Sequence, residues 1–94
     1  MEVRWNLEAK QDFYNTLDYW EEHNGSFEYS LKIIRAVEAL KKELSETPYF
    51  LAKYSGTLKL YNFLDKRFVV YYDVIEEQKV VIIQYFRSSK QKPL

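Results

Sequence analysis

Hydrophobic spacing changes halfway along the chain, and this change limits the possible folds more than any other property of the sequence. Up to residue 47, apolar side chains recur every three or four residues, which is the spacing of one face of an α-helix. From residue 57 onward, the apolar residues are mostly β-branched or aromatic and form short runs typical of strands. The sequence therefore predicts an α+β fold in which the helices precede the sheet.

The first helix is expected between Asn6 and Gly25, after a brief extended segment at residues 3–5. The Asn6 side chain can accept a hydrogen bond from the free amides of the first helical turn. Gly25 suits the left-handed residue that follows many helices. The apolar face of this predicted helix is formed by Ala9, Phe13, Leu17 and Trp20.

A second helix is expected to begin after Ser26 as its N-cap and to end at Thr47, because Pro48 disfavours helical backbone in the residue before it. Its predicted apolar stripe consists of Phe27, Leu31, Ile33, Ile34, Val37, Leu40 and Leu44. Only residues 24–26 separate the two helices, so we expect an antiparallel helix hairpin.

The second half of the sequence predicts a connecting loop at residues 48–56, followed by a three-strand antiparallel meander. The expected strands are residues 57–64, 67–74 and 79–86, joined by turns at residues 65–66 and 76–78. Strand alternation places Tyr85 and Arg87 on one face and Phe86 on the other. The predicted order is β-α-α-β-β-β, with the helix hairpin packed on a small, mainly antiparallel twisted sheet.

Length and composition restrict the possible functions. Ninety-four residues suit a single domain spanning residues 1–94. The chain has no Cys, which excludes disulfides, thiolate catalysis and cysteine-ligated metal, and which favours a reducing compartment. No apolar run approaches the roughly 18 residues of a membrane span, and the N-terminal residues have no apolar signal-peptide core. We therefore expect a cytoplasmic protein without a membrane partner.

Common catalytic constellations are missing from the sequence. Its single histidine, His23, falls at the end of a predicted helix, where a surface role is the simpler interpretation. There is no glycine-rich phosphate loop, and no Ser–His–Asp set has suitable spacing. The acid pairs at residues 21–22 and 76–77 suit a solvated helix face and a turn. We accordingly expect no metal site and no cofactor.

Charge is distributed unevenly although the net charge is zero. Residues 1–47 contain ten acidic and six basic residues, whereas residues 48–94 contain four acidic and eight basic residues. The second half also carries many tyrosines, which can stack on unpaired bases or take part in proton transfer. The basic and aromatic set comprises Lys53, Tyr54, Lys59, Tyr61, Lys66, Arg67, Tyr71, Tyr72, Tyr85, Arg87, Lys90 and Lys92. An ordinary sheet with polar edges and a charged tail explains the same pattern.

The order of these elements resembles the RelE/ParE superfamily of type II toxin–antitoxin toxins along nearly the whole chain. The segments that carry the resemblance are residues 3–5 with Ala9, residues 17–20, Thr47 with Pro48, residues 68–74 and residues 85–93. The resemblance implies a toxin, as in plasmid-stabilisation systems. It also implies an antitoxin partner that wraps the sheet and helices.

RelE-like members cleave messenger RNA on the ribosome without metal, so the resemblance implies a possible metal-independent endoribonuclease, or mRNA interferase. Carried over to this chain, the catalytic residues would be Arg67, Tyr85 and Arg87. The RNA-binding residues would be Lys53, Lys59, Lys90 and Lys92.

Two alternatives stay open at this point. ParE-like members share the fold, lack the catalytic set and poison DNA gyrase instead. A catalytically inert domain that binds an antitoxin-like helix is the third hypothesis, and an exposed aromatic surface around Tyr49, Phe50 and Tyr54 would suit it.

Overall fold

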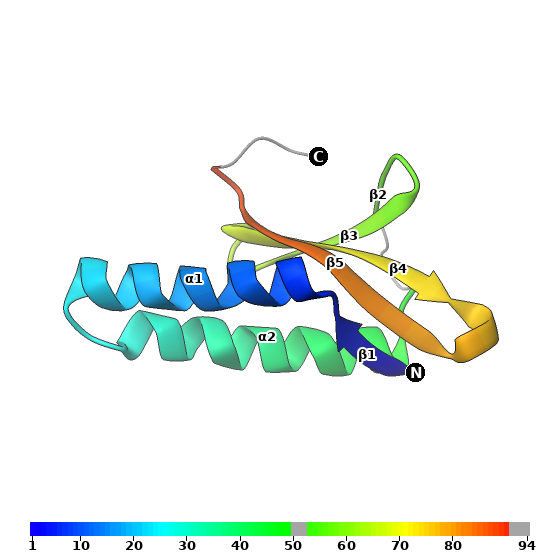
Figure 1. The fold of residues 1–94 in the computed structure, drawn as a ribbon, viewed down its shortest axis with the longest axis horizontal. Coiled ribbons are helices and arrows are strands. Elements are labelled where there is room, and N and C mark those ends of the chain that lie inside the picture. Colours follow the sequence, from blue (N-terminus) through cyan, green and yellow to red (C-terminus); the bar gives the residue numbers. More distant parts are fainter. Residues whose placement is uncertain (50–52, 91–94) are drawn as a thin grey trace.

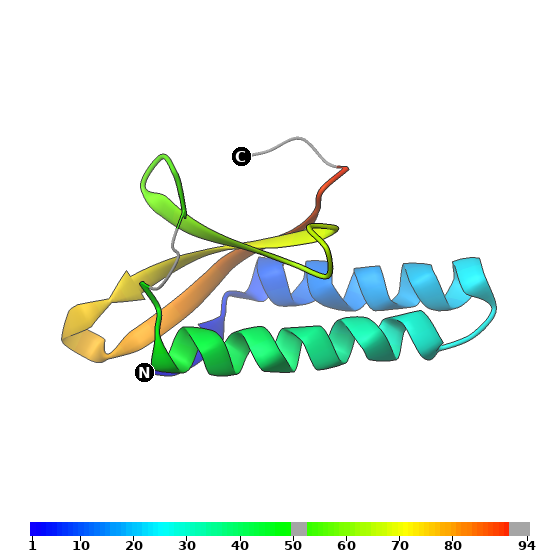
Figure 2. The ribbon, with the colours of Figure 1, turned by 180° about the vertical axis from the view of Figure 1, so that it is seen from behind.

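The computed structural model describes residues 1–49 and 53–90, in which a helix hairpin covers one face of a five-stranded sheet (Figure 1). The helices are α1 (Leu7–Asn24) and α2 (Glu28–Glu46). The strands are β1 (Glu2–Trp5), β2 (Lys53–Ser55), β3 (Leu58–Phe63), β4 (Phe68–Ile75) and β5 (Val80–Ser88). The turn between the helices projects beyond one end of the sheet, as the reverse view also shows (Figure 2). The predicted α+β class is confirmed.

Local signals set the ends of α1 as predicted. The Asn6 side chain accepts a hydrogen bond from the Ala9 amide at 2.9 Å, and Gly25 follows the helix with a left-handed φ of 65°. The start of α2 differs from the prediction, because Phe27 occupies the N-cap position and no side-chain bond caps the helix. The expectation that Ser26 caps α2 is therefore wrong.

The two helices are joined through a small buried residue, Ser30, which the predicted stripe did not include. Its hydroxyl donates a hydrogen bond to the Leu17 carbonyl of α1 at 2.7 Å, and the side chain is fully buried. Phe27 and Leu31, which were expected in the buried stripe, are instead 45% and 39% exposed. The hairpin is therefore packed closely at Ser30, and the apolar stripe of α2 is narrower than its helical spacing suggested.

The strands follow the order β1-β5-β4-β3-β2, with β1 parallel to β5 and all the other pairs antiparallel. The predicted mainly antiparallel sheet is confirmed, but the meander has four strands because β2 lies in the segment expected to be a loop. Residues 68–72 of β4 are all buried, as expected for a strand covered on both faces.

A β-bulge at Gln84 interrupts the pairing of β4 with β5. Tyr71 pairs with Tyr85 and Tyr72 pairs with Ile83, so Gln84 is the extra residue on β5. The Asn6 side-chain amide donates a hydrogen bond to the side-chain amide oxygen of Gln84 at 3.1 Å. A bulge reverses the side-chain alternation beyond it. Consequently Phe86 faces the helices, as Ile83 does before the bulge.

Aromatic rings dominate the core between α1 and the sheet. Phe86 lies at its centre, with its ring centroid 5.5–6.3 Å from those of Phe13, Phe68, Phe63 and Trp5. Trp5 also stacks on Phe13 at 5.2 Å, which attaches β1 to α1. No helix in the described part of the chain is both long and apolar enough to cross a membrane.

Candidate functional site

Tyr85 and Arg87 lie on the outer face of the sheet, opposite the helices. Tyr85 pairs with Tyr71, and the two rings meet edge to face at 6.3 Å. Arg87 pairs with the buried Val69 on the same face. The predicted arrangement, with Tyr85 and Arg87 together and Phe86 on the other face, is confirmed by this register.

Arg67 lies on the helix side of the molecule. It follows a turn in which Leu64, Asp65 and Lys66 all have positive φ, and its Nη1 donates a 3.4 Å hydrogen bond to the Tyr29 hydroxyl of α2. Because β4 begins at the next residue, Arg67 stands at the end of the sheet nearest the hairpin turn. The structure thus separates Arg67 from Tyr85 and Arg87.

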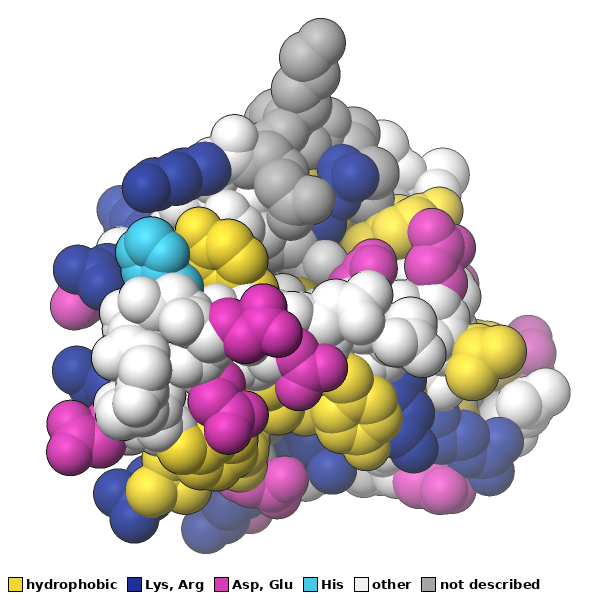
Figure 3. Space-filling view, turned by 60° about the vertical axis from the view of Figure 1, so that its left-hand side comes forward, with side chains coloured by type: hydrophobic (Ala, Val, Ile, Leu, Met, Phe, Trp, Pro, Cys, Tyr) yellow, Lys and Arg dark blue, Asp and Glu magenta, His cyan; other side chains and the backbone are white. Residues whose placement is uncertain are grey.

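A groove opens where Arg67 faces the helices, and we call it the hairpin groove. It has a volume of about 760 Å³ and lies between the C-terminal half of α1, the start of α2, the start of β4 and the end of β5. Residues that define it are Tyr19, Trp20, Tyr29, Arg67, Phe68 and Lys90. Figure 3 shows this end of the molecule, with the histidine next to an exposed hydrophobic side chain and with Lys and Arg side chains nearby.

Three aromatic residues of the hairpin groove were not predicted as site residues. Trp20 is expected on the apolar face of the first helix, Tyr19 and Trp20 belong to a segment that carries the family resemblance, and Tyr29 has no predicted role. The Trp20 ring meets those of Tyr19 and Tyr29 edge to face, at 5.1 and 4.7 Å. The sequence feature that could have indicated them is their position beside the short turn, because this turn brings the two helix ends together.

Lys59 lies in a different cluster, near the end of α2. Its ammonium is 5.3 Å from the ring centroid of Tyr49 and 5.5 Å from that of Tyr54, so it makes two cation–π contacts. The Tyr49 hydroxyl bonds to the Glu76 carboxylate. Nearby, the buried Tyr72 hydroxyl donates to the Pro48 carbonyl at 2.8 Å. These contacts attach the segment after α2 to the sheet.

The remaining predicted RNA-binding lysines are dispersed. Lys53 is exposed on β2, in a row across the outer face that continues through Leu60 and Tyr71 to Tyr85. Three strand spacings separate Lys53 from Tyr85, which is roughly 14 Å. Lys90 is exposed and lines the hairpin groove, whereas Lys92 lies outside the described residues. Across residues 1–49 and 53–90, no group of His, Asp and Glu is arranged to hold a metal ion.

The Tyr49–Glu76 bond leads to a prediction about alkaline pH. The neighbouring carboxylate, mainly through this hydrogen bond, raises the pKa of Tyr49 from 10.0 to about 12. The folded state therefore keeps a proton that the unfolded chain loses, so the stabilisation is complete below pH 10 and is lost as the pH rises to about 12. We expect the difference in urea midpoint between the wild type and Tyr49→Phe to shrink over this range. A difference that stays constant from pH 9 to 12 would contradict the prediction.

Comparisons with known proteins were made for the sequence and for the structure. The structure is similar to the crystal structure of the isolated E. coli RelE toxin, with a TM-score of 0.60 and 14% sequence identity, over 97% of this chain and 86% of that chain. At this identity, the likeness shows a shared fold. A comparison with curated protein sequences finds no significant match.

A family model provides the remaining evidence. The model described as the ParE toxin of the type II toxin–antitoxin system parDE matches residues 3–93, which include every helix and strand of the structure except the first residue of β1. The resemblance to the RelE/ParE superfamily is thereby confirmed. The chain belongs to the ParE toxin family of type II toxin–antitoxin systems.

Proposed function

We propose that this toxin acts by binding and inhibiting DNA gyrase, as ParE-like toxins do, and that it does not cleave RNA. Family membership implies an antitoxin as its partner. The observation that carries the proposal is the separation of the candidate catalytic residues. Arg67 bonds to Tyr29 on the helix side, whereas Tyr85 and Arg87 lie on the outer face of the sheet. Because gyrase acts on chromosomal DNA, the proposal includes a cytoplasmic location.

RNA cleavage without metal places strict demands on geometry. A general base and the cations that stabilise the phosphate must surround one reacting group, within hydrogen-bonding reach of it. In this chain the Arg67 guanidinium bonds to Tyr29 on the helix side, and the Lys59 ammonium contacts two tyrosine rings. Lys53 lies three strands away from Tyr85, with roughly 14 Å between their backbones. The described residues therefore favour a protein target.

The hairpin offers apolar surface for a protein target. Its exposed large apolar side chains are Leu7, Tyr14, Tyr19, Phe27 and Leu31. Leu7 and Tyr14 are seven residues apart on α1, and Phe27 and Leu31 are four residues apart, so each pair shares a helix face. Exposed apolar groups that share a face are typical of protein-binding surfaces.

The test is a supercoiling assay with purified toxin, gyrase, ATP and relaxed plasmid. We expect the toxin to abolish supercoiling at near-stoichiometric concentration, and the same preparation to leave plasmid relaxation by topoisomerase I unchanged. Intact supercoiling in a tenfold excess of toxin would refute the proposal. Unaffected growth after induced expression without the antitoxin would instead favour the inert binding domain. Of the aromatic surface expected for that domain, Tyr49 and Tyr54 are exposed, and Phe50 lies outside the described residues.

RNA cleavage is the second candidate, and one observation favours it. Tyr85 and Arg87 are two residues apart on the same face of β5, so a proton-transfer group and a cation stand side by side on the outer face. The supercoiling experiment therefore includes a parallel arm with translating ribosomes. This candidate would be established if the wild-type toxin cleaves mRNA on the ribosomes, both Tyr85→Phe and Arg87→Ala abolish that cleavage, and supercoiling by gyrase stays intact.

A further inference from the structure

We propose that the hairpin groove binds a single-stranded nucleic-acid segment by stacking its unpaired bases on tyrosine and tryptophan rings and pairing its phosphates with Arg67 and Lys90. This site is separate from the outer face of the sheet, and the inference does not rest on the proposed gyrase target. It rests on the aromatic rings, the charge and the dimensions of the groove.

The aromatic walls come from both helices. Tyr19 is 56% exposed, whereas Trp20 and Tyr29 are partly buried, so all three retain accessible ring surface. Their positions are restrained, because Tyr19 stacks on His23 at 5.5 Å and the Trp20 ring lies between those of Tyr19 and Tyr29. Rings held in place before binding lose little conformational entropy when a base stacks on them.

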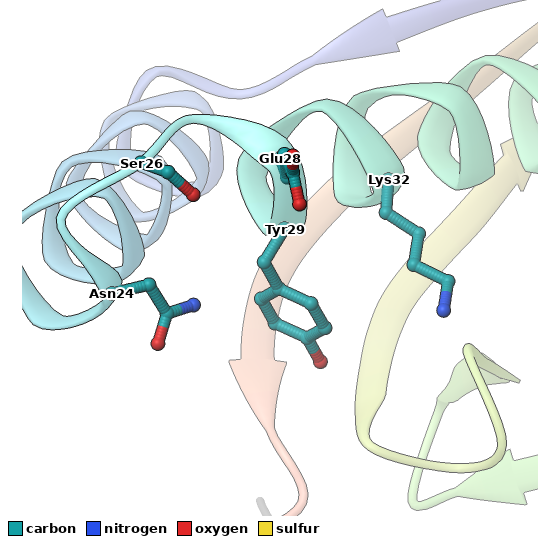
Figure 4. A pocket seen from close by; sticks show the side chains of 5 residues that line it. All are labelled: Asn24, Ser26, Glu28, Tyr29 and Lys32. Carbon is teal, nitrogen blue, oxygen red and sulfur yellow. The ribbon is translucent and has the colours of Figure 1, made fainter.

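The charge of the groove is positive. Arg67 and Lys90 line it from the sheet side, and among the described residues no Asp or Glu belongs to its lining. A smaller hollow of about 340 Å³ shares Tyr29 with the groove, and its lining includes Lys32 and one acid, Glu28. Figure 4 shows the Tyr29 ring and the Lys32 side chain extending in the same direction from α2. A strand that crosses Tyr29 would thus meet Lys32 of α2 as well as Arg67 and Lys90 of the sheet side.

The combination of rings and cations favours nucleic acid over an acidic peptide. Aromatic platforms bordered by Lys and Arg are typical of proteins that bind single strands without reading their sequence. An acidic peptide would pair with Arg67 and Lys90 but would leave the ring surfaces without planar partners. The volume of about 760 Å³ lies in the range of pockets that hold ligands of nucleotide size.

Trp20 allows a direct test, because it is one of only two tryptophans and the other, Trp5, packs against the core away from the groove lining. In a Trp5→Phe background, Trp20 reports on the groove alone. We expect oligo(dT) and oligo(U) of about eight nucleotides to quench Trp20 fluorescence, and a duplex of equal length to bind several-fold more weakly. The DNA and RNA arms show whether the sugar matters. Anisotropy of a labelled oligonucleotide with the unaltered toxin repeats the measurement without relying on the Trp5 variant.

Variants separate stacking from charge. Tyr29→Ala should weaken binding about tenfold or more, because one stacking surface is lost. Arg67→Gln should weaken oligonucleotide binding several-fold. It should also lower the slope of log affinity against log salt concentration by about 0.7, the value for one phosphate contact on a single strand. The matched control is Lys42→Gln, because Lys42 lies on an exposed part of α2 outside the groove. This variant should change neither the affinity nor the salt slope.

The possible outcomes decide the proposal in either direction. Quenching by single strands that is reduced in Tyr29→Ala and in Arg67→Gln would support it. Equal affinity for single strands and duplex would overturn it, because the attraction would then be charge alone. Binding of an oligo-(Glu-Tyr) peptide without binding of the oligonucleotides would also overturn it and would identify a peptide site. Absence of quenching and of any anisotropy change would overturn it as well.

Discussion

Replacement of Phe86 by alanine is expected to lower the free energy of unfolding by about 3–5 kcal/mol. The Phe86 side chain is 2% exposed and contacts four other aromatic rings between α1 and the sheet. Truncation removes the buried ring and leaves a cavity that a rigid aromatic cluster cannot fill by collapse. Because small domains are stable by only about 5–15 kcal/mol, this is a large fraction of the total.

Urea unfolding followed by circular dichroism measures this loss. We expect a lower midpoint for Phe86→Ala with an unchanged slope, and an intermediate loss for Phe86→Leu. Leu7→Ala is the control, because Leu7 is 84% exposed and its truncation should change stability by less than about 0.5 kcal/mol. A loss below about 1 kcal/mol for Phe86→Ala would show that the ring is not packed as described.

Enlargement of Ser30 is expected to have the second-largest effect, because this residue lies where α1 and α2 approach each other. Ser30→Leu should destabilise the protein by about 1–3 kcal/mol, since a fully buried position that touches the α1 backbone has no space for the added atoms. Ser30→Ala should cost only about 1 kcal/mol, because it leaves the Leu17 carbonyl without this donor.

The same urea titration distinguishes packing from hydrogen bonding at this position. The matched control is Ser26→Ala, which should change stability by less than about 0.5 kcal/mol because Ser26 does not cap α2. A true N-cap serine would cost about 1 kcal/mol on this change. If Ser30→Leu is as stable as Ser30→Ala, the close approach of the helices at Ser30 is incorrect.

Local chemistry accounts for the parts of the fold that were predicted correctly. Asn6, Gly25 and Pro48 each act on the backbone within a few residues, so the sequence around them suffices to place a helix end. The strand segments were found by the same kind of local pattern. Ser26 is the exception, because a three-residue turn allows little freedom and Phe27 takes the N-cap position instead.

Burial was harder to predict than secondary structure. Helical spacing placed Phe27 and Leu31 in the stripe of α2, yet both are exposed because α1 and the sheet cover only part of that face. Conversely, Ser30 is buried although it is polar, because its hydroxyl finds a partner on the neighbouring helix. The width of the covered face depends on how the helices pack, which no local pattern encodes.

In the candidate site, too, some features follow from local sequence and others from tertiary packing. The sequence by itself determined that Tyr85 and Arg87 share a face, because strand alternation needs no tertiary information. Only the tertiary structure decided which face this is, since the bulge at Gln84, bonded to Asn6 from the start of the chain, reverses the alternation between Ile83 and Phe86. Likewise, only the left-handed turn at residues 64–66 and the packing of α2 bring Arg67 to Tyr29. The physical reason is that side-chain identity and spacing act locally, whereas the orientation of a strand face depends on contacts between distant segments.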